Sequence, residues 1–380
     1  MLKAPGEFNT KNIAALSPFR VDTEDLIQFD LERWEYVSSY LLDVGLCTFR
    51  RKTLVFVVVH DDSLPLELIE PEAPFGNSKS SIASQELTHS EQLLQQLRLA
   101  SLWSFNFEEW YPGLSSVHVS TLRSEERYPI LPDACFIPLS PDQITFIRRC
   151  LKKRLWYVTP FTDEDNAIIE LLEENITATM KTFSLGEFSE FFVRLSGHSP
   201  KDVNLPLKVT SGKDVMNLIL RSGRSLIDLE MLRKFLIRAK YQNIILLPWN
   251  SEMSIEMEFR CFVFKGNLNA ISQYDFSTAY DSLQNKDIVQ QIQDAIIHFH
   301  EQTVAAVRFA SYVFDVFLSP KSEGDWYVKL IELNPFGGDL SSGSCLFDWE
   351  EDKHILYNPT PGKTCTRILA NESMVFEITK

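Results

Sequence analysis

The chain has 380 residues, of which 44% are hydrophobic and 23% charged, so it can bury a core of normal size in two or three domains. Its 52 acidic residues outnumber its 37 basic residues, and the formal net charge is −15. This charge argues against a general affinity for nucleic acids or anionic membranes, because both require a basic surface on the protein. It does not exclude a small basic pocket for a nucleotide.

Six cysteines occur, and no two of them form a CxxC pair. Most lie in apolar stretches, so we expect reduced core cysteines and no zinc site. The first residues lack the apolar centre of a signal peptide, and the run LVFVVV at 54–59 is too short to span a bilayer. We therefore expect a soluble, cytoplasmic and monomeric protein.

The first 95 residues predict a small α+β module of unknown role. Apolar spacing predicts a helix over 26–45, and the run TLVFVVVH predicts a strand over 53–60. Residues 71–90 are rich in Pro, Ser, Gly and Asn, which is typical of a linker or long loop. Helical periodicity resumes over 91–103.

The middle of the chain mixes helices and strands. Helices are predicted over 141–156, 163–180, 213–223 and 225–240. Short apolar runs predict strands over 115–122, 134–139, 188–197 and 243–249. The aromatic segment WSFNFEEWYP at 103–112 is more typical of core or turn anchoring than of a platform that stacks nucleic-acid bases.

Two β-hairpins flank one amphipathic helix in the next part of the chain. Segment 256–276 predicts a hairpin that turns at Lys265-Gly266-Asn267, and 288–304 predicts the helix. The second hairpin covers 313–339, VFDVFLSPKSEGDWYVKLIELNPFGGD. Strands and helices mixed in this way, with antiparallel hairpins, indicate an α+β fold and not a doubly wound parallel sheet.

Asp315 and Glu332 lie within the apolar strands of the second hairpin, where an unpaired acid costs roughly several kcal/mol. Side chains alternate between the two faces of a strand. Val313, Asp315 and Phe317 are therefore predicted to share one face of the first strand. On the second strand one face is predicted to carry Val328, Leu330, Glu332 and Asn334. A turn over 322–325 would pair Lys321 with Trp326. The same register places Asp315 opposite Glu332.

The local pattern leaves two interpretations of these acids open. Asp315, Glu332 and Asn334 offer hard oxygen ligands without a nearby His or Cys, which is the ligand set of magnesium or manganese. Magnesium usually completes its shell with water and phosphate, so a nucleotide would then be the natural partner. Alternatively, both carboxylates form structural ion pairs with Lys or Arg on a neighbouring strand.

Three cations fit either interpretation. Arg260 lies inside the apolar strand EFRCFVF, Arg194 lies in FFVRLSG, and Lys201 follows in GHSPKD. The sequence has no Walker A loop and no GxGxxG motif. We expect no function for His298 and His300, which do not share a helix face, and no order of residues indicates nucleophilic catalysis, so no catalytic residue is predicted.

Several motifs together resemble the cell division cycle protein 123 family. They are FEEWYP (107–112), RLSGHSPKD (194–202), EFRCFV, ISQYD, VFDVF, IELNPFG and LFDWEE. The resemblance covers roughly residues 100–350 and implies an ATP-grasp fold, in which two α+β lobes hold ATP and magnesium between them. On this basis residues 96–380 form the ATP-grasp-like domain, with a small lobe near 180–250 and a metal-bearing large lobe near 251–350.

The resemblance also implies the residues of a site and a partner. Asp315, Glu332 and Asn334 would hold the metal. ATP would contact these three and the cations Arg194, Lys201, Lys208 and Arg260. The implied role is an assembly chaperone that binds the γ subunit of the heterotrimeric translation initiation factor delivering initiator tRNA. The alternatives are an ATP-grasp enzyme, either a carboxylate-activating ligase or a transferase of phosphate or nucleotide to a protein, and a degenerate fold kept for protein binding.

The chain departs from the family pattern at the nucleotide pocket. Arg194 stands where the family has Lys, and Glu332 stands where it has Asp. Leu247 and Pro248 precede Trp249 where the family has an Arg-Lys pair, so two cations are lost at the edge of the pocket. The first 95 residues have no counterpart in the family pattern.

Overall fold

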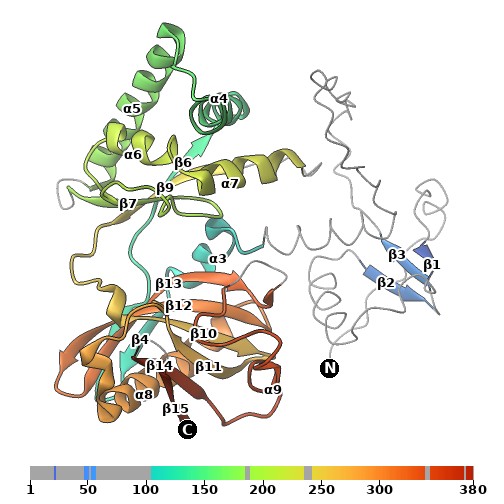
Figure 1. Ribbon diagram of the computed structural model, residues 1–380, viewed down its shortest axis with the longest axis vertical. Coiled ribbons are helices and arrows are strands. Elements are labelled where there is room, and N and C mark those ends of the chain that lie inside the picture. The colour runs from blue at the N-terminus through green and yellow to red at the C-terminus, as the bar shows by residue number, and fades with distance from the viewer. Residues whose placement is uncertain are drawn as a thin grey trace. The chain divides into compact units, whose positions relative to one another are not determined.

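The computed structural model describes residues 21–22, 47–50, 53–56, 104–184, 189–234, 242–338, 343–371 and 374–379. The chain divides into two compact units, Met1–Ser101 and Leu102–Lys380. In the first unit an antiparallel sheet has the order β1 (Val21–Asp22), β3 (Thr53–Phe56), β2 (Cys47–Arg50) (Figure 1). β3 is the start of the predicted strand 53–60. The helices predicted over 26–45 and 91–103, and the predicted linker, lie outside the described residues.

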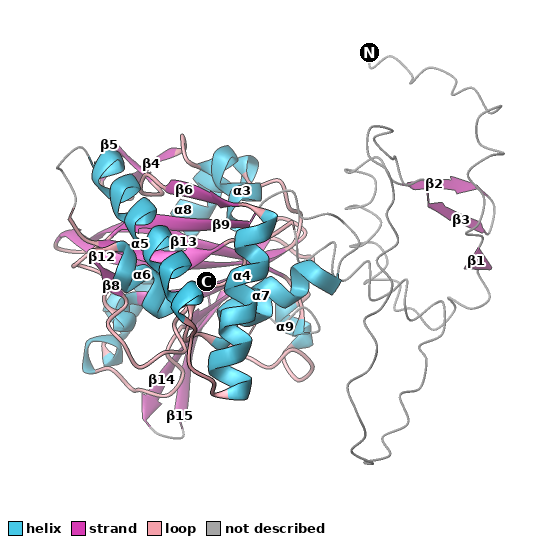
Figure 2. Ribbon diagram, turned by 90° about the horizontal axis from the view of Figure 1, so that it is seen from above, coloured by secondary structure: helices cyan, strands magenta, loops and turns pink. Residues whose placement is uncertain are grey.

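The described part of the second unit contains three sheets, of six, four and two strands, and the four-stranded sheet is antiparallel throughout. The order of its strands is β6 (Cys135–Leu139), β9 (Gln242–Pro248), β7 (Phe191–Leu195), β8 (Lys208–Val209). Four helices share one apolar core with this sheet: α4 (Pro141–Lys152), α5 (Asp163–Ser184), α6 (Gly212–Ile219) and α7 (Gly223–Lys234). Figure 2, seen from above, shows these helices lying over the strands. We call this part the small lobe; it includes β6, α4 and α5, upstream of the predicted start near 180.

The start of α4 follows directly from its sequence. The side chain of Ser140 accepts a hydrogen bond from the backbone N–H of Gln143, whose own side chain accepts one from the backbone of Ser140. This capping box precedes a proline at the first helical position, which has no N–H to satisfy. The α-helix ends at Lys152, and a π-helical turn, Lys153–Tyr157, completes the predicted helix.

The larger sheet has six strands. Their order is β13 (Asp325–Pro335), β12 (Tyr312–Ser322), β10 (Glu258–Phe264), β11 (Asn267–Gln273), β14 (Cys365–Asn371), β15 (Met374–Thr379). All neighbours are antiparallel except β11 and β14, which are parallel. One face packs against helix α8 (Lys286–Thr303), helix α3 (Phe107–Leu114) and the hairpin of β4 (His118–Thr121) and β5 (Ser124–Pro129). We call this part the large lobe.

A second, smaller apolar cluster covers part of the other face of the large sheet. It joins Phe262, Val313, Phe336 and Phe347 to the short helix α9 (Lys353–Leu356). The two lobes together have the mixed, largely antiparallel α+β architecture that the sequence predicts. Five cysteines of the second unit are free, and four of them are buried, as expected: Cys135, Cys150, Cys261 and Cys365, with Cys345 half-buried.

Both predicted hairpins form, and the turn of the first follows the prediction. Lys265 and Gly266 have φ values of 50° and 80° between β10 and β11. Two successive residues with positive φ are typical of the tight turn whose twist matches that of the flanking strands.

In the second hairpin one predicted residue pairing is confirmed and the other is wrong. Asp315 lies opposite Glu332, as predicted. Lys321, however, does not pair with Trp326, because Pro320 takes that place. A β-bulge at Lys321 shifts the register by one residue, and a second irregularity next to Asp315 shifts it back.

The second bulge also overturns the predicted face of β13. Val328 and Leu330 are buried in the core beneath α8, but Glu332 and Asn334 are only partly buried and lie on the opposite face. The extra residue, Ile331, interrupts the two-residue alternation, so side chains after it change faces. The bulge thereby brings Glu332 and Asn334 to the face that carries Asp315.

The elements missed by the sequence reading are short or C-terminal. They include β5, β8, α9, β14 and β15, and helix α3, whose aromatic side chains are buried as the core role of segment 103–112 predicts. No helix in the described part of the chain is long and apolar enough to cross a membrane.

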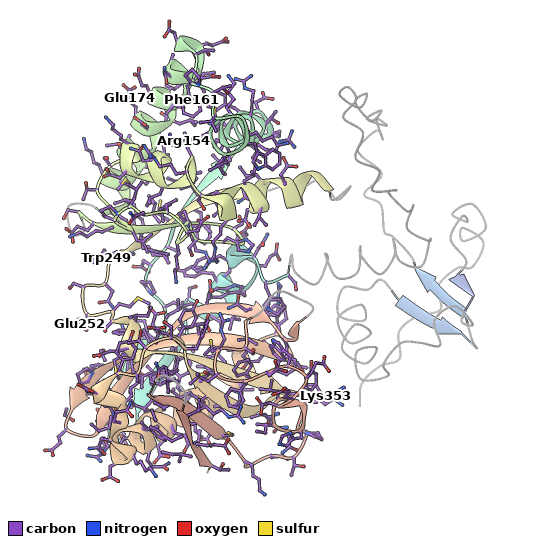
Figure 3. The ribbon with its side chains drawn as sticks, viewed as in Figure 1. Arg154, Phe161, Glu174, Trp249, Glu252 and Lys353 are labelled. Carbon is purple, nitrogen blue, oxygen red and sulfur yellow. The ribbon has the colours of Figure 1, made fainter. Side chains whose placement is uncertain are left out.

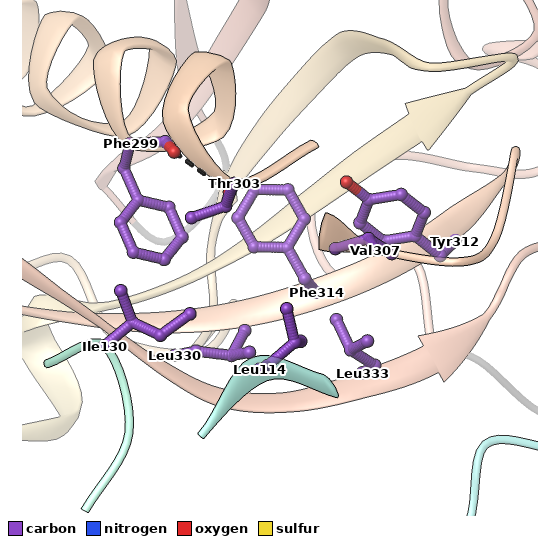
Figure 4. A pocket seen from close by; sticks show the side chains of 9 residues that line it. All are labelled: Leu114, Ile130, Phe299, Thr303, Val307, Tyr312, Phe314, Leu330 and Leu333. Atoms are coloured by element: carbon purple, nitrogen blue, oxygen red, sulfur yellow. Dashed lines mark hydrogen bonds between the residues drawn. The ribbon is translucent and has the colours of Figure 1, made fainter. Parts of the chain in front are cut away.

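A small apolar cavity lies in the large-lobe core beneath α8 (Figure 4). It has a volume of about 10 Å³, room for one water molecule at most. Thr303 lines it, but its hydroxyl donates to the backbone carbonyl of Phe299 at 2.9 Å. The cavity is a packing defect and not a ligand site.

Candidate functional site

Three adjacent strands carry polar side chains on the face of the large sheet opposite α8. Arg260 comes from β10, Asp315 from β12, and Glu332 and Asn334 from β13. Arg260 lies opposite Asp315, and Asp315 lies opposite Glu332. Residues more than 70 positions apart in the sequence therefore meet on one polar patch, which we call the acid–base cluster.

Asp315 and Arg260 form the buried centre of this cluster. The Nε and Nη2 atoms of Arg260 donate to the two carboxylate oxygens at 2.8 and 2.7 Å, and Nη1 donates to the carbonyl of Gly343 at 2.9 Å. Burial raises the pKa of Asp315, while Arg260 opposes the rise. Burial alone would lower the pKa of Arg260, but Asp315 raises it above its ordinary value, so the guanidinium is charged.

Glu332 pairs with a cation from the small lobe. Arg194 on β7 donates from Nη1 to Oε2 of Glu332 at 3.2 Å, so the pair joins the two sheets. The remaining donors of Arg194 reach the carbonyls of Leu195 and Gly197, and its guanidinium lies 4.9 Å from the ring centre of Phe107. Burial alone would raise the pKa of Glu332, but the charges of Arg194, Lys201 and Arg260 lower it to about 2.

The side-chain amide of Asn334 donates hydrogen bonds to both carboxylates. Its Nδ2 lies 3.2 Å from Oδ2 of Asp315 and 3.4 Å from Oε1 of Glu332. The three side chains thus converge on one point, and a half-turn of the amide would present a third oxygen there. Two carboxylates and an amide oxygen are a donor set that fits magnesium. The same side chains also make the arginine ion pairs of the second interpretation, so both sets of contacts are available to them.

Lys201 lies beside the acid–base cluster, whereas Lys208 lies apart from it. The amine of Lys201 is 5.9 Å from the ring centres of both Phe192 and Tyr274. Lys208 is opposite Phe192 on the edge strand β8 and donates to Glu190 at 2.7 Å. Among the contacts of the described residues, none joins Lys208 to the acid–base cluster.

Glu258 belongs to this neighbourhood, although the sequence reading did not single it out. It lies two residues before Arg260 on β10 and therefore on the same face. Burial raises its pKa to about 7, with Asp315 and Glu332 adding to the rise and Lys201 opposing it. The alternation of EFRCFVF, which places Glu and Arg on one face, is the signal that could have found it.

A second missed feature is the anchoring of the turn that carries Lys201. Asp228 on α7 accepts hydrogen bonds from the backbone N–H groups of Gly197 and His198 at 3.0 and 2.9 Å, and it also contacts the ring of His198. A Cβ atom on Gly197 would lie 2.6 Å from Oδ1 of Asp228. The turn is therefore held against α7 at close range, and a side chain at Gly197 would have to displace the carboxylate of Asp228.

The segment that leads from β9 to β10 lacks the cations of the family pattern. Leu247 and Pro248 end β9 opposite Phe192 and Phe191. Trp249 follows and donates its backbone N–H to Glu190. Figure 3 labels Trp249 and Glu252 along this connection between the lobes.

His300 lies on the buried side of α8. His300 is buried, and burial lowers its pKa to about 4. Its ring stacks at 6.1 Å on that of Phe314. In the described part of the chain, no group of three or more His, Cys, Asp or Glu side chains is arranged to hold a metal.

A family model confirms the resemblance that the motifs indicate. The model of the D123 family matches residues 162–379, more than half of the chain. The chain belongs to the D123 family. The D123 match runs from α5 to β15, so it includes the C-terminal hairpin that the sequence reading missed.

Curated relatives are similar over half to two thirds of this chain. A translation initiation factor eIF2 assembly protein of Dictyostelium discoideum is 32% identical over 213 residues, which are 52% of this chain and 49% of that protein. The protein of the same name from Xenopus tropicalis is 30% identical over 276 residues, 64% of this chain and 76% of that one. The match therefore spans about half the length of the Dictyostelium relative.

A viral relative and a solved structure extend the comparison. A putative CDC123-like protein of Acanthamoeba polyphaga mimivirus is 24% identical over 70% of this chain and 74% of its own. The structure of Cdc123 from Schizosaccharomyces pombe superposes with a TM-score of 0.51 at 21% identity, over 69% of this chain and 95% of that one. The second unit thus shares the ATP-grasp-like α+β fold of that structure.

Proposed function

We propose that this protein binds ATP and magnesium and assists the assembly of translation initiation factor eIF2 by binding its γ subunit. The names of its relatives support the assembly role. The nucleotide role rests on one observation, the acid–base cluster. In it Arg194 and Arg260 face Asp315 and Glu332 where the two sheets meet.

The chemistry of the cluster suits a nucleotide. Asp315, Glu332 and Asn334 would hold the magnesium ion, which supplies positive charge to phosphate oxygens when bound. The guanidinium groups of Arg194 and Arg260 offer planar forks that match phosphate oxygens. Until phosphate arrives, each guanidinium neutralises one carboxylate, so the site keeps its shape without an uncompensated buried charge.

An enzyme that uses the same site is the second candidate. It would transfer a phosphoryl or nucleotidyl group to a protein, or activate a carboxylate. Glu258 favours it, because a carboxyl group with a pKa of about 7 beside the cluster is suited to accept a proton from an attacking group near neutral pH.

Nucleotide binding can be tested by thermal unfolding of the full chain with and without Mg-ATP. We expect a rise in the unfolding temperature with Mg-ATP, since a ligand that binds the folded state stabilises it. Asp315→Asn and Glu332→Gln should remove this rise, whereas Glu301→Ala, a change on the exposed side of α8, should leave it intact. If Mg-ATP does not raise the unfolding temperature of the wild type, both ATP-dependent functions are contradicted. The remaining alternative is then a degenerate fold kept for protein binding.

Partner capture then separates assembly from catalysis. The tagged chain, incubated with a eukaryotic lysate and radiolabelled ATP, should retain the eIF2 γ subunit without labelling it. Transfer of label to a protein would favour the enzyme. Absence of all eIF2 subunits from the captured material would argue against the assembly role, whatever the nucleotide result.

A further inference from the structure

The end of helix α4 carries a backbone strain that glycine would relieve. After the π-helical turn the chain passes through Val158, which has a φ of 50° and is 82% exposed. A β-branched residue is rare in this left-handed region, and helices usually place glycine there. The isopropyl group of Val158 is mostly exposed and therefore packs little against the folded chain, so its strained position suggests a role in contacts with other molecules.

A large exposed aromatic side chain precedes this valine by two residues in the sequence. Trp156 is 57% exposed, and the amine of Lys152 lies 5.2 Å from its ring centre. Tryptophan and arginine are enriched among the residues that contribute most to protein interfaces. Trp156 and Val158, two exposed apolar side chains within three residues, are here called the apolar centre.

The surroundings of this apolar centre are basic. Residues 148–154, RRCLKKR, include five basic residues in a chain whose net charge is −15. Arg148 and Lys152 share Glu230, with N–O distances of 3.7 and 2.7 Å. Arg149 and Lys153 share Asp165, at 2.9 and 2.5 Å.

Two carboxylates therefore pair with four of the five cations. The fifth cation, Arg154, contacts an aromatic ring instead. The guanidinium of Arg154 lies 5.9 Å from the ring centre of Phe161, and Figure 3 labels both. Burial and the positive charge of Arg221 lower the pKa of Arg154. Asp163 and Glu164 lie exposed in the first turn of α5, but the ion pairs of the described residues do not connect them to this basic run. The five cations outnumber the two acids that pair with them, so the ion pairs leave positive charge on this surface.

We propose that Arg149, Arg154, Trp156 and Val158, here called the α4 patch, dock an acidic protein segment that also carries a large apolar side chain. Charge complementarity selects the acidic segment, because the patch is basic while the chain as a whole is acidic. A nucleic acid is less favoured than a short peptide, because the net charge of −15 repels a long polyanion along its whole length, whereas a short acidic segment contacts only the basic patch. This surface needs neither nucleotide nor the acid–base cluster.

The test uses fluorescence anisotropy with the full chain and a short labelled peptide of glutamates and two leucines. Matched peptides replace the leucines by serines or the glutamates by lysines. We expect the glutamate–leucine peptide to bind about tenfold more tightly than either control and more weakly at high salt. Equal binding of the serine peptide, tighter binding of a polyuridine RNA, or no binding would overturn the proposal.

Variants then locate the binding surface. Val158→Gly should weaken binding about fivefold while leaving the unfolding temperature equal or higher, because it relieves the strained backbone. Trp156→Ser and Arg154→Gln should weaken binding further. Leu171→Ser, at a leucine of α5 that is 58% exposed, and Lys213→Gln on α6 are the matched controls and should change nothing. Equal effects of patch and control variants would contradict the assignment.

Discussion

Arg260 holds Asp315 through two parallel hydrogen bonds of 2.8 and 2.7 Å, made between neighbouring strands of the large sheet. Both side chains are buried, with 8% and 2% of their surface exposed. Two charges removed from water in this way are each stable only while the other is present. The pair therefore serves the folded chain even before any ligand is considered.

Removing one member of this pair should destabilise the protein strongly. Arg260→Met leaves the carboxylate of Asp315 without its main partner, and we expect a loss of about 3–5 kcal/mol in the free energy of unfolding. Urea unfolding at neutral pH measures it. The double variant Arg260→Met with Asp315→Leu should recover much of the loss. A double variant as unstable as the single one would show that the ion pair is not the cause.

The ion pair of Glu332 with Arg194 predicts an acid-dependent loss of stability. The pKa of Glu332 is lowered from 4.5 to about 2 in the folded chain. A lowered carboxyl pKa stabilises the fold above pH 4.5, and this contribution disappears as the pH falls from 4.5 towards 2. We expect a contribution of about 1–3 kcal/mol at neutral pH.

Unfolding measured from pH 7 to pH 3 tests this contribution. Glu332→Gln should show a smaller loss of stability on acidification than the wild type. Glu301→Ala, on the exposed side of α8, should behave as the wild type. Parallel pH curves for Glu332→Gln and the wild type would contradict the assigned role.

Gly212 should not tolerate a side chain. A Cβ atom there would lie 1.9 Å from the backbone carbonyl oxygen of Glu173, where α6 meets α5. We expect Gly212→Ala to cost about 3 kcal/mol or more in thermal or urea unfolding, because backbone must move. Gly113→Ala in α3 is the control: its Cβ meets nothing within 4 Å, and alanine should stabilise by about 0.5–1 kcal/mol. Equal effects would mean that the helices separate easily.

His300 predicts a second pH effect, in a higher range. Its pKa is lowered from 6.5 to about 4 because the folded chain buries the neutral ring. The unfolded chain therefore binds a proton first, and stability is lost as the pH falls from 6.5 towards 4. The variant His300→Phe keeps the stacking on Phe314 but cannot be protonated. Its free energy of unfolding, minus that of the wild type, should be about 2 kcal/mol larger at pH 5 than at pH 7. A pH profile of His300→Phe identical to that of the wild type would contradict the prediction.

Much of the local structure could be predicted from sequence. The helices α4, α5 and α8 begin at or close to their predicted residues because capping and acidic first-turn residues mark their starts. The turn at Lys265 and Gly266 fixed the first hairpin. The acids of the second hairpin were recognised because charges within apolar strands need partners.

The sequence alone thus determined which residues had to find partners: Asp315, Glu332, Arg194 and Arg260. Tertiary structure decided which partners they found. Arg194 pairs with Glu332, which lies 138 positions further along the chain. Strand β14 pairs in parallel with β11, and no turn signal in the sequence predicts such a pairing. The bulge at Ile331 turns Glu332 and Asn334 towards Asp315. Periodicity could not show this, because a bulge breaks the alternation from which faces are predicted.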